Sequence, residues 1–219
     1  ASDVYKRQDD VLGVQLAQIL SEASLSLYVR QAAAIALKKY VRKRWSIFFD
    51  TFTQDMVVNG IVQTVDATPV EAKEHIRTSL LACLCDAEPK VRSQASDILS
   101  LISSCDFPDH FPQLLPTLQA YLHSYTEQDA HAAYKVHGAM KFLLDLVHVE
   151  LDENQLLMVA QQLVPLLQGI VSSSSDWITP HTRARCINVF HQCLISLYMA
   201  KDSYVDTVLS LIHISEPTR

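Results

Sequence analysis

The 219-residue sequence predicts an all-α protein, and three observations carry that prediction. Apolar residues recur at spacings of three and four along segments long enough to form helices. Only four residues are glycine, whereas the hairpin turns and bulges of all-β proteins draw heavily on glycine. Hydrophobic residues make up 49% of the chain and charged residues 19%, which provides enough apolar surface for a folded core.

Both ends of the chain resemble translated sequencing adapter. The codons that can encode residues 3–8 are the reverse complement of codons that can encode the start of 209–219. We therefore expect 1–8 and 209–219 to be adapter artefacts and the natural protein to continue beyond both ends of 9–208. Residues 9–208 carry a net charge of −7, and the whole chain carries −6.

The first helices are predicted from their apolar spacing. A short amphipathic stripe ends near Ser21, and a second helix runs from about Leu27 to Trp45. One side of this second helix is expected to be apolar, with Val29, Ala33, Ala36, Leu37, Tyr40, Val41 and Trp45. Another side is expected to be basic, with Arg30, Lys38, Lys39, Arg42 and Lys43. Residues 46–66 interrupt the pattern and are predicted to be a loop or an irregular insertion.

The remaining helices follow turns that contain proline. Thr68 is predicted to be an N-cap with Pro69 at the first helical position, and Pro89 to open the next helix. Further helices are expected over 111–123, 128–149, 153–172 and 180–200, with another beginning near Tyr204. Pro116 and Pro165 lie inside two of these segments, where kinks or late starts are expected.

The helices fall into antiparallel pairs, and the second helices begin near residues 27, 89, 128 and 180. The intervals of 62, 39 and 52 residues scatter around the roughly 40–47 residues of a HEAT-type repeat. We therefore predict an α-solenoid of about four HEAT-type helix pairs with a right-handed superhelical twist. Residues 9–45 would end a first repeat and 67–208 would form the others. A closed helical bundle has the same periodicity, but the recurring pairs with short corners favour the solenoid.

Several kinds of chemistry are not expected. No glycine-rich phosphate loop can be written from the four glycines, and no uninterrupted apolar run reaches the roughly 18 residues of a membrane span. Cys83 and Cys85 lack the spacing of a zinc site, so we expect the five cysteines to be reduced, mostly buried thiols. Trp45 and Trp177 are expected to be packing residues or interface anchors. We therefore predict no catalytic residue, no cofactor and no metal site.

Four stretches carry a resemblance to a known family. Residues 29–45 resemble the second helix of the importin-β N-terminal domain, with Arg-Gln, small residues, Leu-Lys and a closing Trp. Residues 106–114 resemble a corner of that superfamily in which aromatic-Pro steps precede the next repeat, and residues 136–143 and 181–193 resemble later helices of its importin-nine branch. The likeness covers about 11–200. It departs from the family in the long 46–66 segment and in lacking sequence upstream of Asp9 for a complete first repeat.

This resemblance implies a nuclear transport receptor that shuttles between cytoplasm and nucleus. Such a receptor binds the GTP form of the small GTPase Ran, carries basic cargo such as histones and ribosomal proteins, and contacts nucleoporins. Direct binding of nucleic acid or membrane is not implied. The inner helices would contact the partners, and the candidate contact residues are Lys38, Arg42, Gln94, Asp97, Lys141 and Asp145.

Alternatives remain for both the site and the function. The basic side of the 27–45 helix would meet an acidic surface of Ran, or it is a solvated face near a helix C-terminus, which favours cations. The protein would be an importin, another karyopherin such as an exportin, or a HEAT-repeat scaffold unrelated to transport. A helical enzyme is disfavoured, because no catalytic motif is present.

Overall fold

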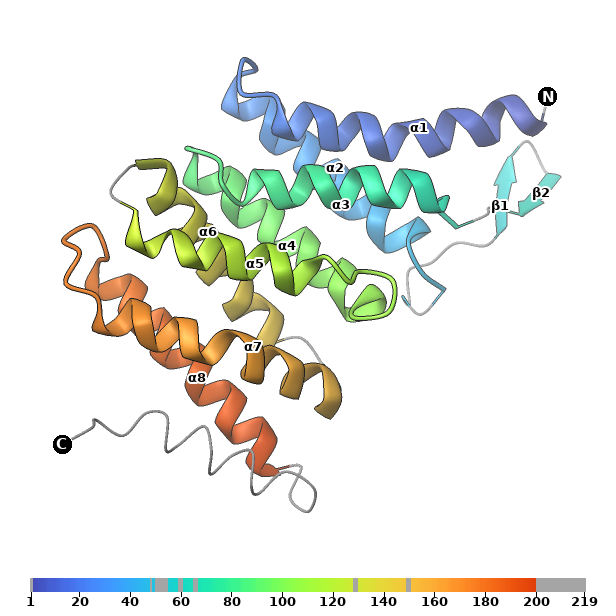
Figure 1. The fold of residues 1–219 in the computed structure, drawn as a ribbon. Coiled ribbons are helices and arrows are strands. Elements are labelled where there is room, and N and C mark those ends of the chain that lie inside the picture. Colours follow the sequence, from blue (N-terminus) through green and yellow to red (C-terminus); the bar gives the residue numbers. More distant parts are fainter. Residues whose placement is uncertain are drawn as a thin grey trace. The chain divides into compact units, whose positions relative to one another are not determined.

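The chain, described by a computed structural model, is built from helices that pack in antiparallel pairs (Figure 1). The described residues are 2–47, 49, 55–58, 61–64, 67–127, 130–148 and 151–199, with the backbone alone described over 2–10, 55–58, 61–64, 153 and 196–199. The chain divides into two compact units, Ala1–Cys105 and Asp106–Arg219, and each is described by itself.

The first unit contains two helix pairs and a small hairpin. The element bounds are α1 Ser2–Ser21, α2 Leu27–Arg44, β1 Asp55–Val58, β2 Ile61–Thr64, α3 Val70–Cys83 and α4 Pro89–Asp106. Helix α1 packs against its pair partner α2 and also against α3, the first helix of the next pair. Contacts therefore run both within a pair and along the stack of pairs.

The second unit repeats this arrangement. The element bounds are α5 Leu114–His123, the 3₁₀ turn η1 Ser124–Thr126, α6 Ala130–His148, α7 Glu153–Ser172 and α8 Pro180–Met199. Helix α5 packs against α6 and α7, and α8 packs against α6 and α7. The first helices of the two pairs therefore form one layer and the second helices form another. This is the stacked-pair packing that the sequence predicts.

Local sequence signals explain where several helices begin. The Asp152 carboxylate accepts a hydrogen bond from the Gln155 backbone N–H, and the Gln155 side-chain oxygen accepts one from the Asp152 N–H, both at 2.8 Å. This capping box satisfies two N–H groups that a helix start leaves without partners, so α7 begins at Glu153. Pro89 and Pro180 occupy the first positions of α4 and α8, where a missing N–H costs nothing.

Most of the predicted helix ranges are confirmed. Helices α2, α4, α6, α7 and α8 begin within two residues of the predicted starts. Helix α5 begins at Leu114, three residues later than predicted, so that Pro116 falls in its first turn. Pro165 lies inside α7, as expected. The helix predicted from Tyr204 and the 209–219 segment lie outside the described residues.

The predicted N-cap of α3 is wrong by one residue, because Pro69 is the N-cap and Val70 the first helical residue. The hydroxyl of Thr68 instead bonds the carbonyl oxygen of Arg44 at 2.9 Å and the Tyr40 hydroxyl at 3.1 Å. Thr68 is buried, so its hydroxyl needs partners within the protein. The tie to the end of α2 supplies them.

Residues 46–66 were predicted to be a loop or irregular insertion, but their described part contains an antiparallel hairpin. Strand β1 pairs with β2 in the register Asp55↔Thr64 to Val58↔Ile61. The sequence does contain the signal for it. Asn-Gly, at positions 59 and 60, separates two runs rich in β-branched residues, and this dipeptide favours the tight turn of a hairpin.

Helix α7 is apolar over a longer stretch than the sequence analysis expected, since no membrane-spanning segment was predicted. Its residues Asn154–Ser172 are long enough and apolar enough to cross a membrane by length and composition alone. The same helix packs against α5 and α8 and buries side chains that include Leu156, Leu163 and Ile170. We therefore assign α7 to the core of the second unit.

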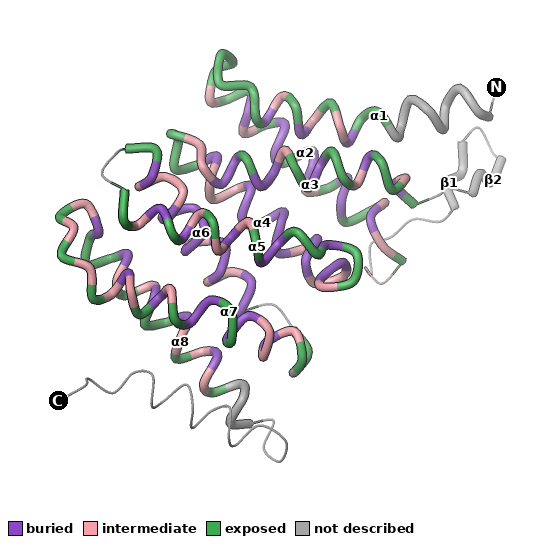
Figure 2. The backbone as a smooth tube through the Cα atoms, viewed as in Figure 1, coloured by how far each residue is buried: buried purple, intermediate pink, exposed green. Residues whose placement is uncertain are grey.

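The core of each unit lies along the sides that its helices turn toward one another (Figure 2). In the first unit this includes a close approach between α1 and α2. Gly13 is buried, and a Cβ atom placed there would lie 2.5 Å from Cε1 of the Tyr40 ring and 3.0 Å from Cδ1 of Ile76. Glycine at this position lets the Tyr40 ring lie against the α1 backbone.

The substitution Gly13→Ala is therefore expected to destabilise the chain, even though alanine favours helix by about 1 kcal/mol over glycine. Overpacking costs typically about 1–3 kcal/mol, and the added methyl group meets both Tyr40 and Ile76. Urea denaturation followed by circular dichroism measures the effect. Gln15→Ala on the exposed side of α1 is the matched control and should leave the midpoint unchanged or slightly raised. A Gly13→Ala midpoint at or above that of the unaltered chain would contradict the packing.

Candidate interaction surface

The second helix of the first pair, α2, leaves one continuous stripe uncovered. Positions 28, 32, 35, 39 and 42 follow helical spacing and are all exposed. The stripe is apolar near the start of the helix, where Tyr28 is 85% and Ile35 55% exposed. It is basic near the end, where Lys39 and Arg42 lie. Such a surface suits a partner that is apolar at one end and acidic at the other.

Two of the predicted contact residues meet beside this stripe. The Lys38 Nζ lies 3.6 Å from an Asp97 carboxylate oxygen, so that α2 and α4 are bridged by an ion pair. Both side chains remain partly in water, which limits the contribution of the pair to stability to about 1 kcal/mol or less. Arg42 lies one turn beyond Lys38 on α2 and is exposed.

The other predicted residues are placed differently. Lys141 and Asp145 form an ion pair with each other one turn apart on α6, the second helix of the third pair. Gln94 is half-buried on α4, and its Oε1 is buried without a hydrogen-bond partner among the described residues. The structure therefore brings together two pairs, Lys38 with Asp97 and Lys141 with Asp145.

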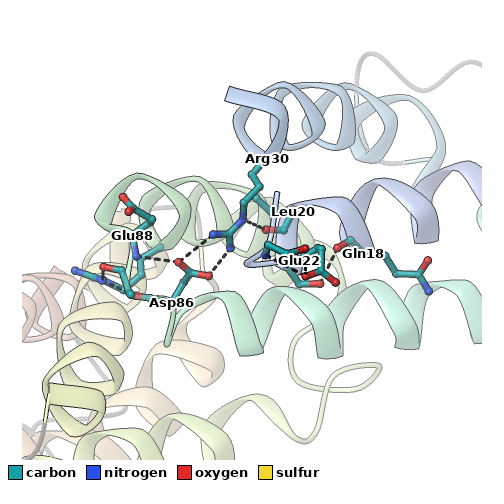
Figure 3. Close-up of polar contacts among 10 residues, drawn as sticks. Gln18, Leu20, Glu22, Arg30, Asp86 and Glu88 are labelled. Atoms are coloured by element: carbon teal, nitrogen blue, oxygen red, sulfur yellow. Dashed lines mark hydrogen bonds and ion pairs between the residues drawn. The ribbon is translucent and has the colours of Figure 1, made fainter. Parts of the chain in front are cut away.

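Arg30 does not lie on the basic side of α2, contrary to the prediction. It is only 3% exposed, and its guanidinium forms a two-pronged ion pair with the Asp86 carboxylate in the turn between α3 and α4 (Figure 3). Its Nε donates to the Leu20 carbonyl oxygen at 2.7 Å, in the last turn of α1. One buried side chain thus ties together the end of α1, the start of α2 and the following pair.

Asp86 is itself held on several sides. Its carboxylate accepts a hydrogen bond from the Glu88 N–H at 2.8 Å (Figure 3). Its carbonyl oxygen accepts one from Arg92 Nη1 at 2.5 Å. The same Arg92 atom also donates to the Ala87 carbonyl oxygen at 2.9 Å. The charge of Arg30 is therefore matched by a carboxylate whose position is already fixed, which a buried ion pair requires.

Known proteins resemble most of this chain. Residues 6–86 match the family profile of the importin-β N-terminal domain, a range that includes both Arg30 and Asp86. Importin subunit beta-5 of Schizosaccharomyces pombe is 27% identical over 191 residues, or 86% of this chain. Importin-9 of Drosophila melanogaster is 25% identical over 185 residues, or 84% of this chain. Residues 6–86, the part of the chain that this profile covers, belong to the importin-β superfamily.

The fold agrees with this assignment. A solved structure titled as Lph2, a novel bidirectional nuclear transport receptor in S. cerevisiae, matches 94% of the chain with a TM-score of 0.69 and 17% identity. The predicted all-α fold of HEAT-type helix pairs is confirmed by this likeness. The chain spans 18% of the S. pombe relative, 16% of the Drosophila relative and 20% of the solved chain.

A recurring arginine is one structural feature of this chain that sequence reasoning missed. Arg30, Arg92 and Arg183 are each the fourth residue of the second helix of a pair. Each donates to a backbone carbonyl near the end of the preceding helix, and Arg183 reaches the Ser173 oxygen at 2.9 Å. The sequence contained a signal for this feature, because arginine occupies the same position counted from the start of each of these helices. The spacing of apolar residues alone does not reveal that position.

The exposed apolar residues of the stripe were also missed. Val29 was assigned to the apolar side of α2 but is 47% exposed, and Tyr28 and Ile35 were not singled out. The helix carries apolar residues around much of its circumference, so their spacing does not define a single side. The contacts with α1 determine which side is buried.

The two tryptophans serve as packing residues. Trp45 is fully buried, with the Lys73 ammonium 5.0 Å and the Arg77 guanidinium 5.9 Å from its ring centre. Trp177 is half-buried; its indole N–H donates to the Glu127 carbonyl oxygen at 3.2 Å, and its ring meets His137 edge-on. Both tryptophans therefore join neighbouring elements within one unit.

The cysteines are placed as structural thiols. All five are free, and burial raises the pKa of Cys83, Cys186 and Cys193 from about 9 to about 12. These three thiols therefore stay protonated near neutral pH and are poor nucleophiles and metal ligands. Among the residues searched, which are those that the structure describes, no three His, Cys, Asp or Glu side chains are grouped to hold a metal ion.

Removing one partner of the buried pair is expected to destabilise the chain strongly. Asp86→Ala leaves the Arg30 charge buried without its carboxylate, a change that costs about 3–5 kcal/mol. Asp97→Ala is the matched control, since it removes the acidic partner of the half-exposed pair with Lys38 and should cost about 1 kcal/mol or less. The double variant Arg30→Met with Asp86→Ala should recover part of the lost free energy of unfolding, measured by urea titration. Equal costs for the two single variants would contradict the structural assignment.

Alkylation of the native chain at pH 8 should modify Cys85 and Cys105, which are half-buried, before Cys83, Cys186 and Cys193. Mass spectrometry of digested protein reads the sites. The three buried thiols hold their protons more tightly in the folded than in the unfolded chain, so the free energy of unfolding should decrease as the pH rises from about 9 toward 12. Equal labelling of all five cysteines in folded protein would refute their burial.

Proposed function

We propose that this chain is part of a nuclear transport receptor that binds the GTP form of Ran and carries basic proteins, such as histones and ribosomal proteins, into the nucleus. The observation that carries the proposal is the uncovered apolar and basic stripe on α2, in a chain whose residues 6–86 belong to the importin-β superfamily. The receptor acts by reversible binding, with energy from GTP hydrolysis on its partner, and performs no reaction of its own. It shuttles between cytoplasm and nucleus.

The GTPase contact is assigned to α2 by its charge. Lys38, Lys39, Arg42 and Lys43 concentrate positive charge near the end of this helix in a chain whose net charge is −6. A basic surface attracts an acidic partner and is a poor site for basic cargo. Tyr28 and Ile35 at the other end provide apolar area that is buried on binding. The excess of acidic residues elsewhere in the chain favours basic cargo.

The nucleoporin contact is assigned to the first helices of the second unit. Helix α5 and residues 154–172 of α7 contain no Asp, Glu, Lys or Arg. The two helices pack together, and the Gln119 side chain donates to the Gln162 carbonyl oxygen at 3.3 Å. Their outer positions include exposed Pro116, Gln161 and Pro165. An uncharged surface of this kind suits uncharged partner segments and does not compete for basic cargo.

Export is the second candidate function. The solved structure with the same fold is titled as a bidirectional nuclear transport receptor, so the fold is found in a protein described with both directions. The sign of the coupling distinguishes the two functions. Ran-GTP should lower the affinity of an importin for its cargo and raise that of an exportin.

The charge reversal Lys38→Glu with Arg42→Glu should weaken binding of GTP-loaded Ran to the chain by at least about tenfold, measured by titration calorimetry. The exchange Lys38→Arg with Arg42→Lys preserves charge and should retain binding. Gln15→Glu with Gln18→Glu adds negative charge to exposed positions of α1 and should change little. Ran loaded with GDP should bind more weakly than the GTP form. Unchanged affinity after the reversal would remove the α2 contact, and indifference to the nucleotide would remove the transport assignment.

A further inference from the structure

The hairpin of β1 and β2 is not used by the function proposed above. Its strands are antiparallel and paired from Asp55↔Thr64 to Val58↔Ile61, and the sheet has two strands in the described part of the chain. Each strand is therefore paired along one edge only. Among the described residues, no further strand pairs with the backbone N–H and C=O groups of the opposite edge, which can therefore pair with another extended segment.

Apart from the charged Asp55 at the start of β1, the two strands lack the side chains that usually discourage strand addition. Neither contains proline or lysine, and the register is continuous without a bulge. Five of the eight strand residues are β-branched, which favours extended backbone. An isolated two-stranded hairpin is marginally stable in water, so a third strand would stabilise it.

The charge of this region selects the kind of added strand. The sequence from 46 to 72 contains four acidic residues and no lysine, arginine or histidine. One of the four, Asp55, occupies the first position of β1 opposite Thr64. An extended segment with lysine or arginine would therefore be attracted here, and an acidic one repelled.

We propose that an open edge of the β1–β2 hairpin binds an extended basic segment of a partner protein by strand addition. The inference deepens the proposed function, because it names the form in which part of a basic cargo would bind. Backbone hydrogen bonds would supply affinity, and the acidic residues of the 46–72 sequence would supply the preference for lysine and arginine.

The test uses the 219-residue chain and a short synthetic peptide in which lysine and valine alternate. The peptide should bind at least about tenfold more tightly than its glutamate–valine counterpart. Binding should also slow hydrogen exchange at alternate amides of one hairpin strand, because only every second N–H of a strand points to its open edge. Equal affinity for the two peptides, absence of binding, or binding without this alternating protection would each overturn the proposal.

Two variants make the assignment specific. Replacing residues 55–64 with a glycine–serine segment of equal length should abolish peptide binding while the helical circular dichroism signal is retained. Asp55→Asn should weaken binding several-fold and leave the hairpin amides in place. Binding that survives the replacement would overturn the inference. Ran-GTP binding, measured on the same proteins, reports separately on the proposed function, because the hairpin replacement leaves the α2 stripe intact.

Discussion

The buried charge of Arg30 is the constraint on which the first unit depends. Withdrawing a guanidinium from water is costly unless its donors find acceptors in fixed positions. Those acceptors come from the end of α1 and from Asp86 in the turn between α3 and α4. Satisfying one side chain therefore specifies how the first helix pair sits against the next. Because Arg30 lies in the first turn of α2, the same contacts orient the exposed stripe of that helix.

Burial explains why charges on one helix have different roles. Arg30 is enclosed and structural, whereas Lys39 and Arg42 are exposed to water. Lys38 is intermediate, since its ion pair with Asp97 joins two helices but stays half-exposed. A partner that approaches the stripe would compete with water for these groups, at little cost to the fold. Under the proposed function, stability and recognition therefore depend on different residues of α2.

Helix positions could be predicted from the sequence because they follow local rules. The apolar spacing of α8 and the Asp152 capping box of α7 are both read from neighbouring residues. The partner of Arg30 could not be predicted in this way, because Asp86 is 56 residues away. The hairpin was missed for a different reason: its Asn-Gly signal lies in a segment that was judged only against helical periodicity. Lys38 and Asp97 were predicted to lie on the same contact surface, but the contact between their side chains was not predicted.

The central claim is that the exposed side of α2 receives a GTPase whose nucleotide controls binding. Hydroxyl-radical footprinting of the chain tests it directly, because Tyr28 is reactive when exposed and reports on its own side chain. The account predicts that oxidation of Tyr28 falls when GTP-loaded Ran is added and stays at the level of the free chain with the GDP form. Oxidation that is the same in both nucleotide states, with Ran bound, would show that the partner contacts another surface.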